Sequence, residues 1–205
     1  YKADADNTIV NGYKSNLRTR ATGSNAGLAD VSEVYSIYGR ESSASSELSR
    51  IITKFDTASI IADRSAGLIP AAGSVSFYMR LYNAETTKSV PTGIELVAQG
   101  ISTEWTEGNG LDLENYTDKG ESNWTKATSA TSWATPGGDY HATPIFSQSL
   151  PTGLEDVEMD ITDLVEDWIS GAKVNYGVGL RLSAAQETAA ESYYTKRFFA
   201  RGTEF

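Results

Sequence analysis

The residues best suited to chemistry are carboxylates gathered in one Gly-rich stretch: Glu104, Glu107, Asp112, Glu114, Asp118, Glu121 and Asp139. Two acids about 5–9.5 Å apart around a sugar can hydrolyse a glycosidic bond. Carboxylates and backbone carbonyls can also surround Ca²⁺ with about six to eight oxygens. Acids in a polar loop are common without either role, so glycan hydrolysis is the weakest alternative. Calcium stays open as a ligand, with Asp112, Asp118 and Asp139 as its expected side chains.

Other catalytic chemistries lack the side chains that they need. His141 is the only histidine, and no Gly-x-Ser-x-Gly turn accompanies it, so a Ser-His-Asp triad is not indicated. The absence of cysteine excludes disulfides, thiolate metal sites and a cysteine nucleophile. No phosphate-binding Gly-x-x-x-x-Gly-Lys loop occurs. We therefore expect a protein that is not an enzyme and that needs no cofactor, calcium aside.

Aromatic side chains recur through the same stretch. Trp105, Trp124, Trp133 and Tyr140 could stack on sugar rings, which would make them a glycan-binding site. Alternatively they pack together as a small second core that keeps a long loop ordered. Exposed rings would support sugar stacking and buried rings would support a structural loop, and the sequence leaves both interpretations open.

Charge and hydropathy narrow the range of partners. The formal net charge of −10 leaves no basic patch that could displace counterions from phosphates, which argues against nucleic acid. No apolar run approaches the roughly 18 residues that a membrane-spanning helix requires, so no membrane insertion is expected. Acidity of this kind is typical of an exposed protein that stays soluble.

Most of the elements that must position these side chains are predicted strands. The clearest is 75–82, where Val75, Phe77, Met79 and Leu81 alternate with Ser76, Tyr78, Arg80 and Tyr82. Period two over this length predicts one buried face and one solvated face. Further strands are predicted at 8–10, 33–38, 48–55, 94–101, 154–161, 178–182 and 193–200. Residues 102–152 lack a strand pattern and are predicted to form a long aromatic loop.

One short helix is predicted at about 162–170, because apolar residues recur there at helical spacing. These residues are Ile161, Leu164, Val165, Trp168 and Ile169. Gly171 suits the left-handed residue that follows a helix. The expected fold is all-β: a jelly-roll-like antiparallel β-sandwich with one docked helix. Residues 1–205 are expected to form a single domain, in a natural chain that continues beyond residue 205.

Several short motifs occur in a definite order. They are Leu48 to Phe55-Asp56, Val75-Ser-Phe-Tyr-Met-Arg-Leu-Tyr82, Glu104-Trp105-Thr-Glu-Gly108, Met159-Asp-Ile-Thr-Asp-Leu-Val-Glu-Asp-Trp168 and Tyr176-Gly-Val-Gly-Leu180. From residue 48 onward, the chain resembles the DNRLRE domain family. That resemblance implies a jelly-roll-like sandwich that serves as a carbohydrate-binding or adhesive module, with no catalytic residues to carry over.

The aromatic loop departs from the usual family pattern. It is expanded into Ser122-Asn-Trp-Thr-Lys-Ala127 and Trp133-Ala-Thr-Pro-Gly-Gly-Asp-Tyr140. This form resembles structural proteins of tailed bacteriophages, which implies a virion module of the neck, tail, fibre or head decoration. Its expected partners are other virion proteins, further copies of itself in a homo-oligomer, and a host-surface glycan. The alternative is a carbohydrate-binding module of a secreted or cell-surface protein.

Overall fold

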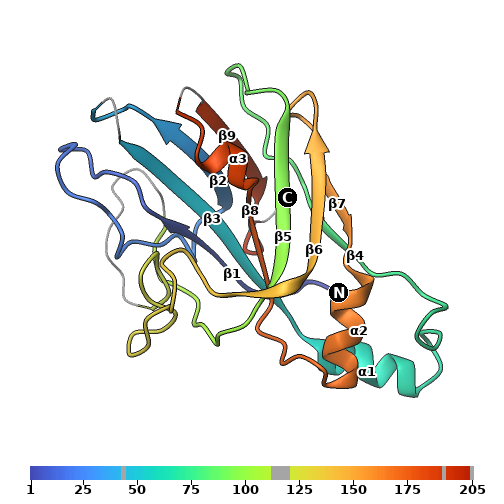
Figure 1. Ribbon diagram of the computed structural model, residues 1–205. Coiled ribbons are helices and arrows are strands. Elements are labelled where there is room, and N and C mark those ends of the chain that lie inside the picture. Colours follow the sequence, from blue (N-terminus) through green and yellow to red (C-terminus); the bar gives the residue numbers. More distant parts are fainter. Residues whose placement is uncertain (43–44, 112–120, 191–192, 204–205) are drawn as a thin grey trace.

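The computed structural model describes residues 1–42, 45–111, 121–190 and 193–203. Within these ranges the chain forms nine strands and three short helices (Figure 1). The strands are β1 (Ala3–Val10), β2 (Val31–Tyr38), β3 (Ser46–Phe55), β4 (Tyr78–Leu81), β5 (Ile94–Ile101), β6 (Tyr140–Leu150), β7 (Val157–Asp160), β8 (Val178–Leu182) and β9 (Tyr193–Phe199). The helices are α1 (Thr57–Ser65), α2 (Thr162–Ser170) and α3 (Ala184–Glu187).

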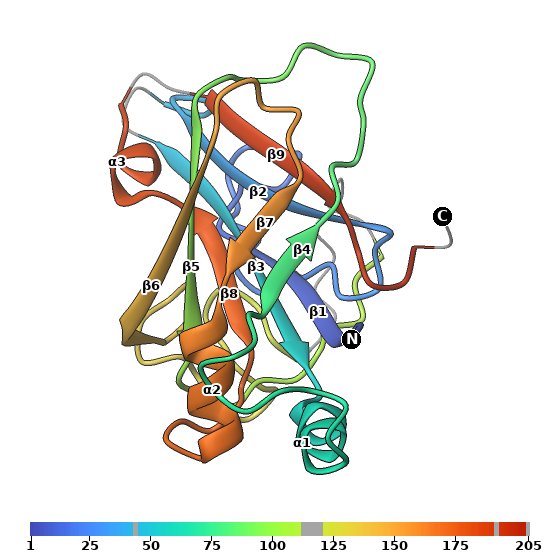
Figure 2. The ribbon, with the colours of Figure 1, turned by 90° about the vertical axis from the view of Figure 1, so that its right-hand side faces the viewer.

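The strands form two antiparallel sheets of unequal size. The large sheet has the order β6-β5-β8-β3-β2-β9, and β1 pairs with β3 off this path. The small sheet consists of β4 and β7, which lie over one face of the large sheet (Figure 2). This arrangement confirms the predicted all-β antiparallel sandwich. None of the helices in the described ranges is both long enough and apolar enough to cross a membrane.

The large sheet forks at Ser49. The pairing of β1 with β3 ends there, and the pairing of β2 with β3 begins there, along the same edge of β3. The Ser49 hydroxyl accepts the Tyr35 N–H at 2.9 Å and donates to the Glu33 carbonyl at 2.8 Å, so a side chain replaces part of the backbone ladder. From Ser49 onward, β2 and β9 turn away from β1. The face of β3 near Phe55 that points into the sandwich therefore lies next to the small sheet.

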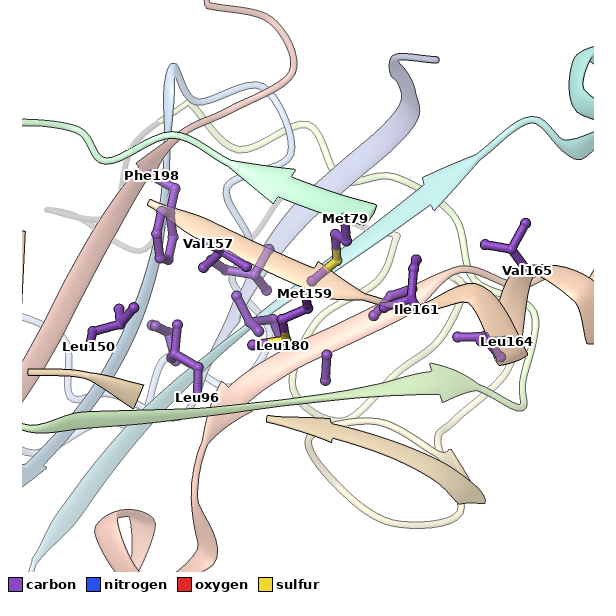
Figure 3. Packing of buried hydrophobic residues seen from close by; sticks show 14 of the residues in the cluster. Met79, Leu96, Leu150, Val157, Met159, Ile161, Leu164, Val165, Leu180 and Phe198 are labelled. Carbon is purple, nitrogen blue, oxygen red and sulfur yellow. The ribbon is translucent and has the colours of Figure 1, made fainter. Parts of the chain in front are cut away.

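The main core lies between the two sheets. Met79 of β4 and Met159 of β7 meet Leu96, Leu180 and Phe198 of the large sheet (Figure 3). Each such side chain stabilises the fold by about 1.5–3 kcal/mol relative to an exposed one. The predicted two faces of the 75–82 segment are confirmed, because Met79 is 2% exposed whereas Tyr78 and Tyr82 are 51% and 59% exposed.

Helix α2 confirms the helix predicted at about 162–170. Leu164, Val165 and Trp168 are buried, and Gly171 ends the helix with φ 76°. Leu164 packs directly against Gly100 of β5, where a Cβ would lie 2.8 Å from Leu164 Cδ1. The helix therefore closes one end of the sandwich, as its apolar stripe predicted.

The expectation of one helix was incomplete. Helix α1 follows β3, with Asp56 as its N-cap accepting the Ala58 N–H at 2.8 Å. Only Ile60 of α1 is buried, so the segment carries too weak an apolar stripe to stand out in sequence. It is tied to α2 by a two-pronged ion pair between Arg64 and Glu166, at 2.6 and 2.7 Å.

The loop predicted at 102–152 is shorter than expected, because its last part forms a strand. Strand β6 occupies Tyr140–Leu150 and pairs with β5, so the loop ends at Asp139. β6 lies at one edge of the large sheet and contains Pro144, a residue that is tolerated in edge strands and weakens a strand prediction. The solvated edge position also removes the apolar alternation that marked the other strands.

Candidate functional site

The three tryptophans of the aromatic loop form a second core. Trp105, Trp124 and Trp133 are only 5%, 6% and 5% exposed. They pack with Ile9, Ile52, Ile101 and Ala127 on the outer side of the large sheet, and Tyr140 and Tyr176 line this cluster. The arrangement is the one expected for a loop pinned by its own aromatic residues, and the faces of these indoles are not open for stacking on a sugar.

The indole N–H groups of Trp105 and Trp133 each have a hydrogen-bond acceptor. Trp105 Nε1 donates to the Tyr176 carbonyl at 2.7 Å, and Trp133 Nε1 donates to the Asn123 carbonyl at 2.8 Å. Buried tryptophans usually need such a partner. The first bond ties the loop to the segment before β8, and the second closes the loop on itself.

The loop is also held to the rest of the protein through glycines. Gly110 N–H donates to Asn25 Oδ1 at 2.8 Å, and the Gly110 carbonyl accepts the Leu28 N–H at 2.8 Å. A Cβ on Gly110 would lie 1.7 Å from the Asn25 carbonyl oxygen, so no larger residue fits without movement of the backbone.

We expect Gly110→Ala to detach the start of the loop from Asn25. The measurable result is faster protease cleavage near residue 110 and altered tryptophan fluorescence, since Trp105 lies in the same loop. Gly202→Ala is the matched control, because a Cβ there meets nothing within 4 Å. Equal cleavage rates in the two variants would contradict the proposed attachment.

Tyr140 is the one predicted aromatic residue that reaches an open surface. Its hydroxyl donates to the Gly137 carbonyl at 2.7 Å, and its ring lies 5.9 Å from the Arg50 guanidinium and 4.8 Å from that of Arg181. Gly179 allows this approach, since a Cβ there would lie 2.2 Å from Tyr140 Cε1.

A hollow of about 490 Å³ opens beside this ring, and we call it the Tyr140 hollow. It is lined by Arg50, Ser102, Thr103, Ala134, Thr135, Gly138, Asp139, Tyr140 and Arg181. Arg50 is neutralised by Glu187, with bonds of 2.9 and 2.7 Å. Arg181 Nη2 donates to Gln99 Oε1, whereas its buried Nη1 has no hydrogen-bond partner among the described residues. Burial lowers the pKa of Arg181, which marks a cation that is poorly compensated there.

The predicted calcium side chains are only partly described. Asp112 and Asp118 lie outside the described residues. Asp139 accepts hydrogen bonds from the Thr135 N–H at 2.8 Å, the Ala134 N–H at 2.9 Å and the Thr103 hydroxyl at 3.0 Å, so it closes a tight turn. Across the ranges that the structure covers, no three His, Cys, Asp or Glu side chains gather as they would around a metal ion. Calcium binding stays a prediction.

A second hollow, larger than the Tyr140 hollow, was not expected from the sequence. It measures about 1010 Å³ and lies between β4, the start of β1 and the end of β9, and we call it the β4 groove. Ile51, Thr53 and Phe55 of β3 form its apolar floor. The exposed rings of Tyr1, Tyr78 and Tyr82, at 63%, 51% and 59%, stand at its rim. The outer face of the 75–82 pattern was the only signal of it in the sequence.

The groove exists because part of one edge of β4 has no partner strand among the described residues. The Ile161 N–H donates to the Phe77 carbonyl at 2.9 Å, which fixes the odd-numbered residues as those that bond to β7. The backbone groups of Tyr78 and Arg80 therefore point the other way. Beyond them the same edge does find a partner, since the Phe199 N–H donates to the Tyr82 carbonyl at 3.0 Å. At Tyr78 and Arg80, no strand in the described structure occupies that edge.

A charged cluster forms the end wall of the β4 groove. Arg201 Nη2 donates to both oxygens of Glu107 at 2.8 and 2.9 Å, and its backbone N–H donates to Asp6 Oδ2 at 2.9 Å. Burial raises the pKa of Asp6, and the Arg201 N–H partly offsets this by favouring the carboxylate. Both acids are held by one arginine, an arrangement that suits a rigid wall better than acid–base catalysis.

No family model, curated protein or solved structure matches this chain. The fold and the geometry of its two hollows are therefore the basis on which a function is proposed.

Proposed function

We propose that this protein is a non-enzymatic assembly module, in which the free edge of β4 pairs with an extended strand of a neighbouring protein. The observation that carries the proposal is the backbone of Tyr78 and Arg80, which no described strand pairs on the side that faces an open groove with a largely apolar floor. Exposed sheet edges are templates for strand addition, in which main-chain hydrogen bonds give affinity and pockets for alternate side chains give specificity.

The shape of the groove suits such a strand. A chain that paired with β4 would lie over Ile51, Thr53 and Phe55, where its inward side chains would complete the sandwich core. Its outward side chains would meet Tyr78 and Tyr82, and tyrosine is enriched in protein interfaces. The simplest supplier of the strand is a second copy of this chain in a homo-oligomer.

The resemblance of the motifs to the DNRLRE domain family supports a setting for this assembly. The expanded loop between Ser122 and Tyr140 favours the form seen in structural proteins of tailed bacteriophages. The protein is accordingly proposed as a virion structural or attachment module, in the neck, tail, fibre or head decoration.

A pair of variants at Arg80 tests strand addition. Arg80→Pro removes the N–H that faces the groove and leaves the bonds between β4 and β7 intact, because proline is tolerated where the N–H points away from the ladder. Arg80→Ala removes the same side chain and keeps the N–H. Both variants lose the exposed ion pair between Arg80 and Glu158, at 3.0 Å, which contributes at most about 1 kcal/mol to stability.

Light scattering on the purified chain gives the readout. We expect an oligomer for the wild type and for Arg80→Ala, and a monomer for Arg80→Pro. An oligomer of unchanged mass in the proline variant would contradict pairing at the β4 edge, as would a wild-type protein that stays monomeric at its highest soluble concentration.

A second candidate function is binding of an anionic glycan in the Tyr140 hollow, which fits the alternative of a secreted or cell-surface carbohydrate-binding module. The observation that favours it is the buried Arg181 Nη1, which has no hydrogen-bond partner in the described structure although Arg181 lines the hollow beside the half-buried Tyr140 ring. Arginine pairs well with carboxylate and sulfate groups through its planar fork.

The glycan alternative predicts that oligosaccharides with acidic groups bind and that neutral ones do not. Arg181→Gln should weaken that binding at least about tenfold, since a hydrogen bond to a charged group contributes about 1.5–3 kcal/mol. Arg18→Gln, at an exposed site outside both hollows, is the control. Binding that is the same in both variants would remove the Tyr140 hollow from consideration.

A further inference from the structure

Lys196 is the most unusual charged residue in the described structure. It lies on β9 with its side chain in the core, and only 3% of it is exposed. Its ammonium group donates to Asn83 Oδ1 at 2.6 Å and to the Gly153 carbonyl at 2.9 Å, and it lies 5.2 Å from the Phe198 ring. No carboxylate among the described residues forms an ion pair with it. Lysines are almost never this buried without one.

Asn83 is held in place against the amine. It follows β4 and bridges to Phe198, so its side chain faces the same interior as that of Lys196. Its backbone N–H donates to Asp156 Oδ1 at 2.7 Å. The amine of Lys196 and the amide of Asn83 are thus in contact in a site that holds little water. The fold fixes the two side chains from separate strands, and such positioning raises the effective concentration of two reacting groups.

Two carboxylates, Glu155 and Asp156, act electrostatically on Lys196. Glu155 Oε1 accepts the Thr152 N–H at 2.9 Å and its hydroxyl at 2.8 Å, whereas Glu155 Oε2 is buried with no hydrogen-bond partner in the described structure. The Thr152 bonds hold the pKa of Glu155 at about 2, so this carboxylate stays ionised and is a weak base. Burial lowers the pKa of Lys196, against the opposing charges of Glu155 and Asp156, and so favours the neutral, nucleophilic amine.

We propose that Lys196 and Asn83 join through an isopeptide bond that forms within the folded protein. The lone pair of Lys196 Nζ attacks Cγ of Asn83 and forms an Nζ–Cγ bond. The Cγ–Nδ2 bond then breaks, and Nδ2 leaves as ammonia after gaining a proton from Nζ. An amine and a primary amide become a secondary amide and ammonia, so no oxidant or cofactor is required.

The bond would link the two sheets covalently. Lys196 belongs to the large sheet, Asn83 extends the small sheet, and the two residues are 113 positions apart in the chain. The cross-link lies at the closed end of the β4 edge, just beyond the groove, and would prevent the small sheet from separating under load. It does not depend on the proposed assembly, because its chemistry needs only the folded monomer.

Mass spectrometry of the intact folded protein tests the proposal. The wild type should weigh about 17 Da less than its sequence predicts, the mass of the ammonia that leaves after nucleophilic attack. Peptide mapping should yield one branched peptide that contains both residues. Lys196→Arg and Asn83→Ala should each restore the full mass, and the control Lys173→Arg should keep the loss.

Two results would overturn the proposal. One is a wild-type protein of full mass after prolonged incubation in the folded state. The other is a loss of about 17 Da that persists in Lys196→Arg and maps to a succinimide at Asn11-Gly12, since that ring closure expels ammonia by the same kind of acyl substitution.

Asn83→Asp covers the case in which the alanine variant fails to fold. It preserves the shape of the site and should lose water, about 18 Da, if the same bond forms.

Discussion

Replacing Trp105 by alanine is expected to lower the free energy of unfolding by about 3–5 kcal/mol, the usual range for truncating a buried tryptophan. Trp105 is 5% exposed, contacts the second core, and donates its indole N–H to the Tyr176 carbonyl. The variant leaves a large cavity and a carbonyl without its donor. A loss of this size would be a large part of the total stability of a typical domain.

Chemical denaturation followed by circular dichroism measures this change. Tyr193→Ala provides the control, because Tyr193 is 59% exposed and such surface changes are usually worth about 0.5 kcal/mol or less. A Trp105 variant as stable as the control would mean that the loop does not rest on a core, and it would return Trp105, Trp124 and Trp133 to consideration as glycan contacts.

The second large effect concerns the proposed cross-link. Asn83→Ala is expected to destabilise the protein by about 4–5 kcal/mol, because a link that closes a loop of roughly 100 residues removes that much chain entropy from the unfolded state. Lys196→Arg should cost a similar amount, and the double variant should cost little more than either single change, since each already abolishes the same bond.

Denaturation midpoints of the wild type and the three variants provide this measurement. If only the hydrogen bond between Lys196 and Asn83 were present, Asn83→Ala would cost about 1–3 kcal/mol, the range for leaving one buried partner unsatisfied. Two results together would contradict the cross-link. One is a loss of unfolding free energy in Asn83→Ala that stays within that range, and the other is an unfolded wild-type protein that migrates as a linear chain in denaturing gels.

The elements that the sequence predicted well are those whose pattern is local. Helix α2 shows a full apolar stripe and was predicted at nearly its observed position. The period-two segment 75–82 was predicted as a strand, and β4 occupies only Tyr78–Leu81 within it. Helix α1 was missed because it buries only Ile60, and β6 because it is an edge strand that contains Pro144. In these two segments the tertiary contacts decide the structure, and the local sequence carries little trace of them.

The candidate sites depend on contacts between distant parts of the chain. The tryptophans could be predicted to lie together in one loop, but only the packing of that loop on Ile9 and Ile52 shows that their rings are buried. The β4 groove arises from strand order, which leaves one edge unpaired. Likewise, nothing near Lys196 in the sequence points to Asn83, because the two meet only when β9 and the end of β4 come side by side.

Hydrogen–deuterium exchange at single-residue resolution tests strand addition at β4 most directly. The amides of Tyr78 and Arg80 should exchange rapidly in the monomer and slow markedly on assembly, because the added strand would accept their hydrogens. The Met79 amide, which already faces β7, should change little and serves as the internal reference. Assembly that leaves exchange at Tyr78 and Arg80 unchanged would contradict the proposed pairing and place the interface elsewhere on the protein.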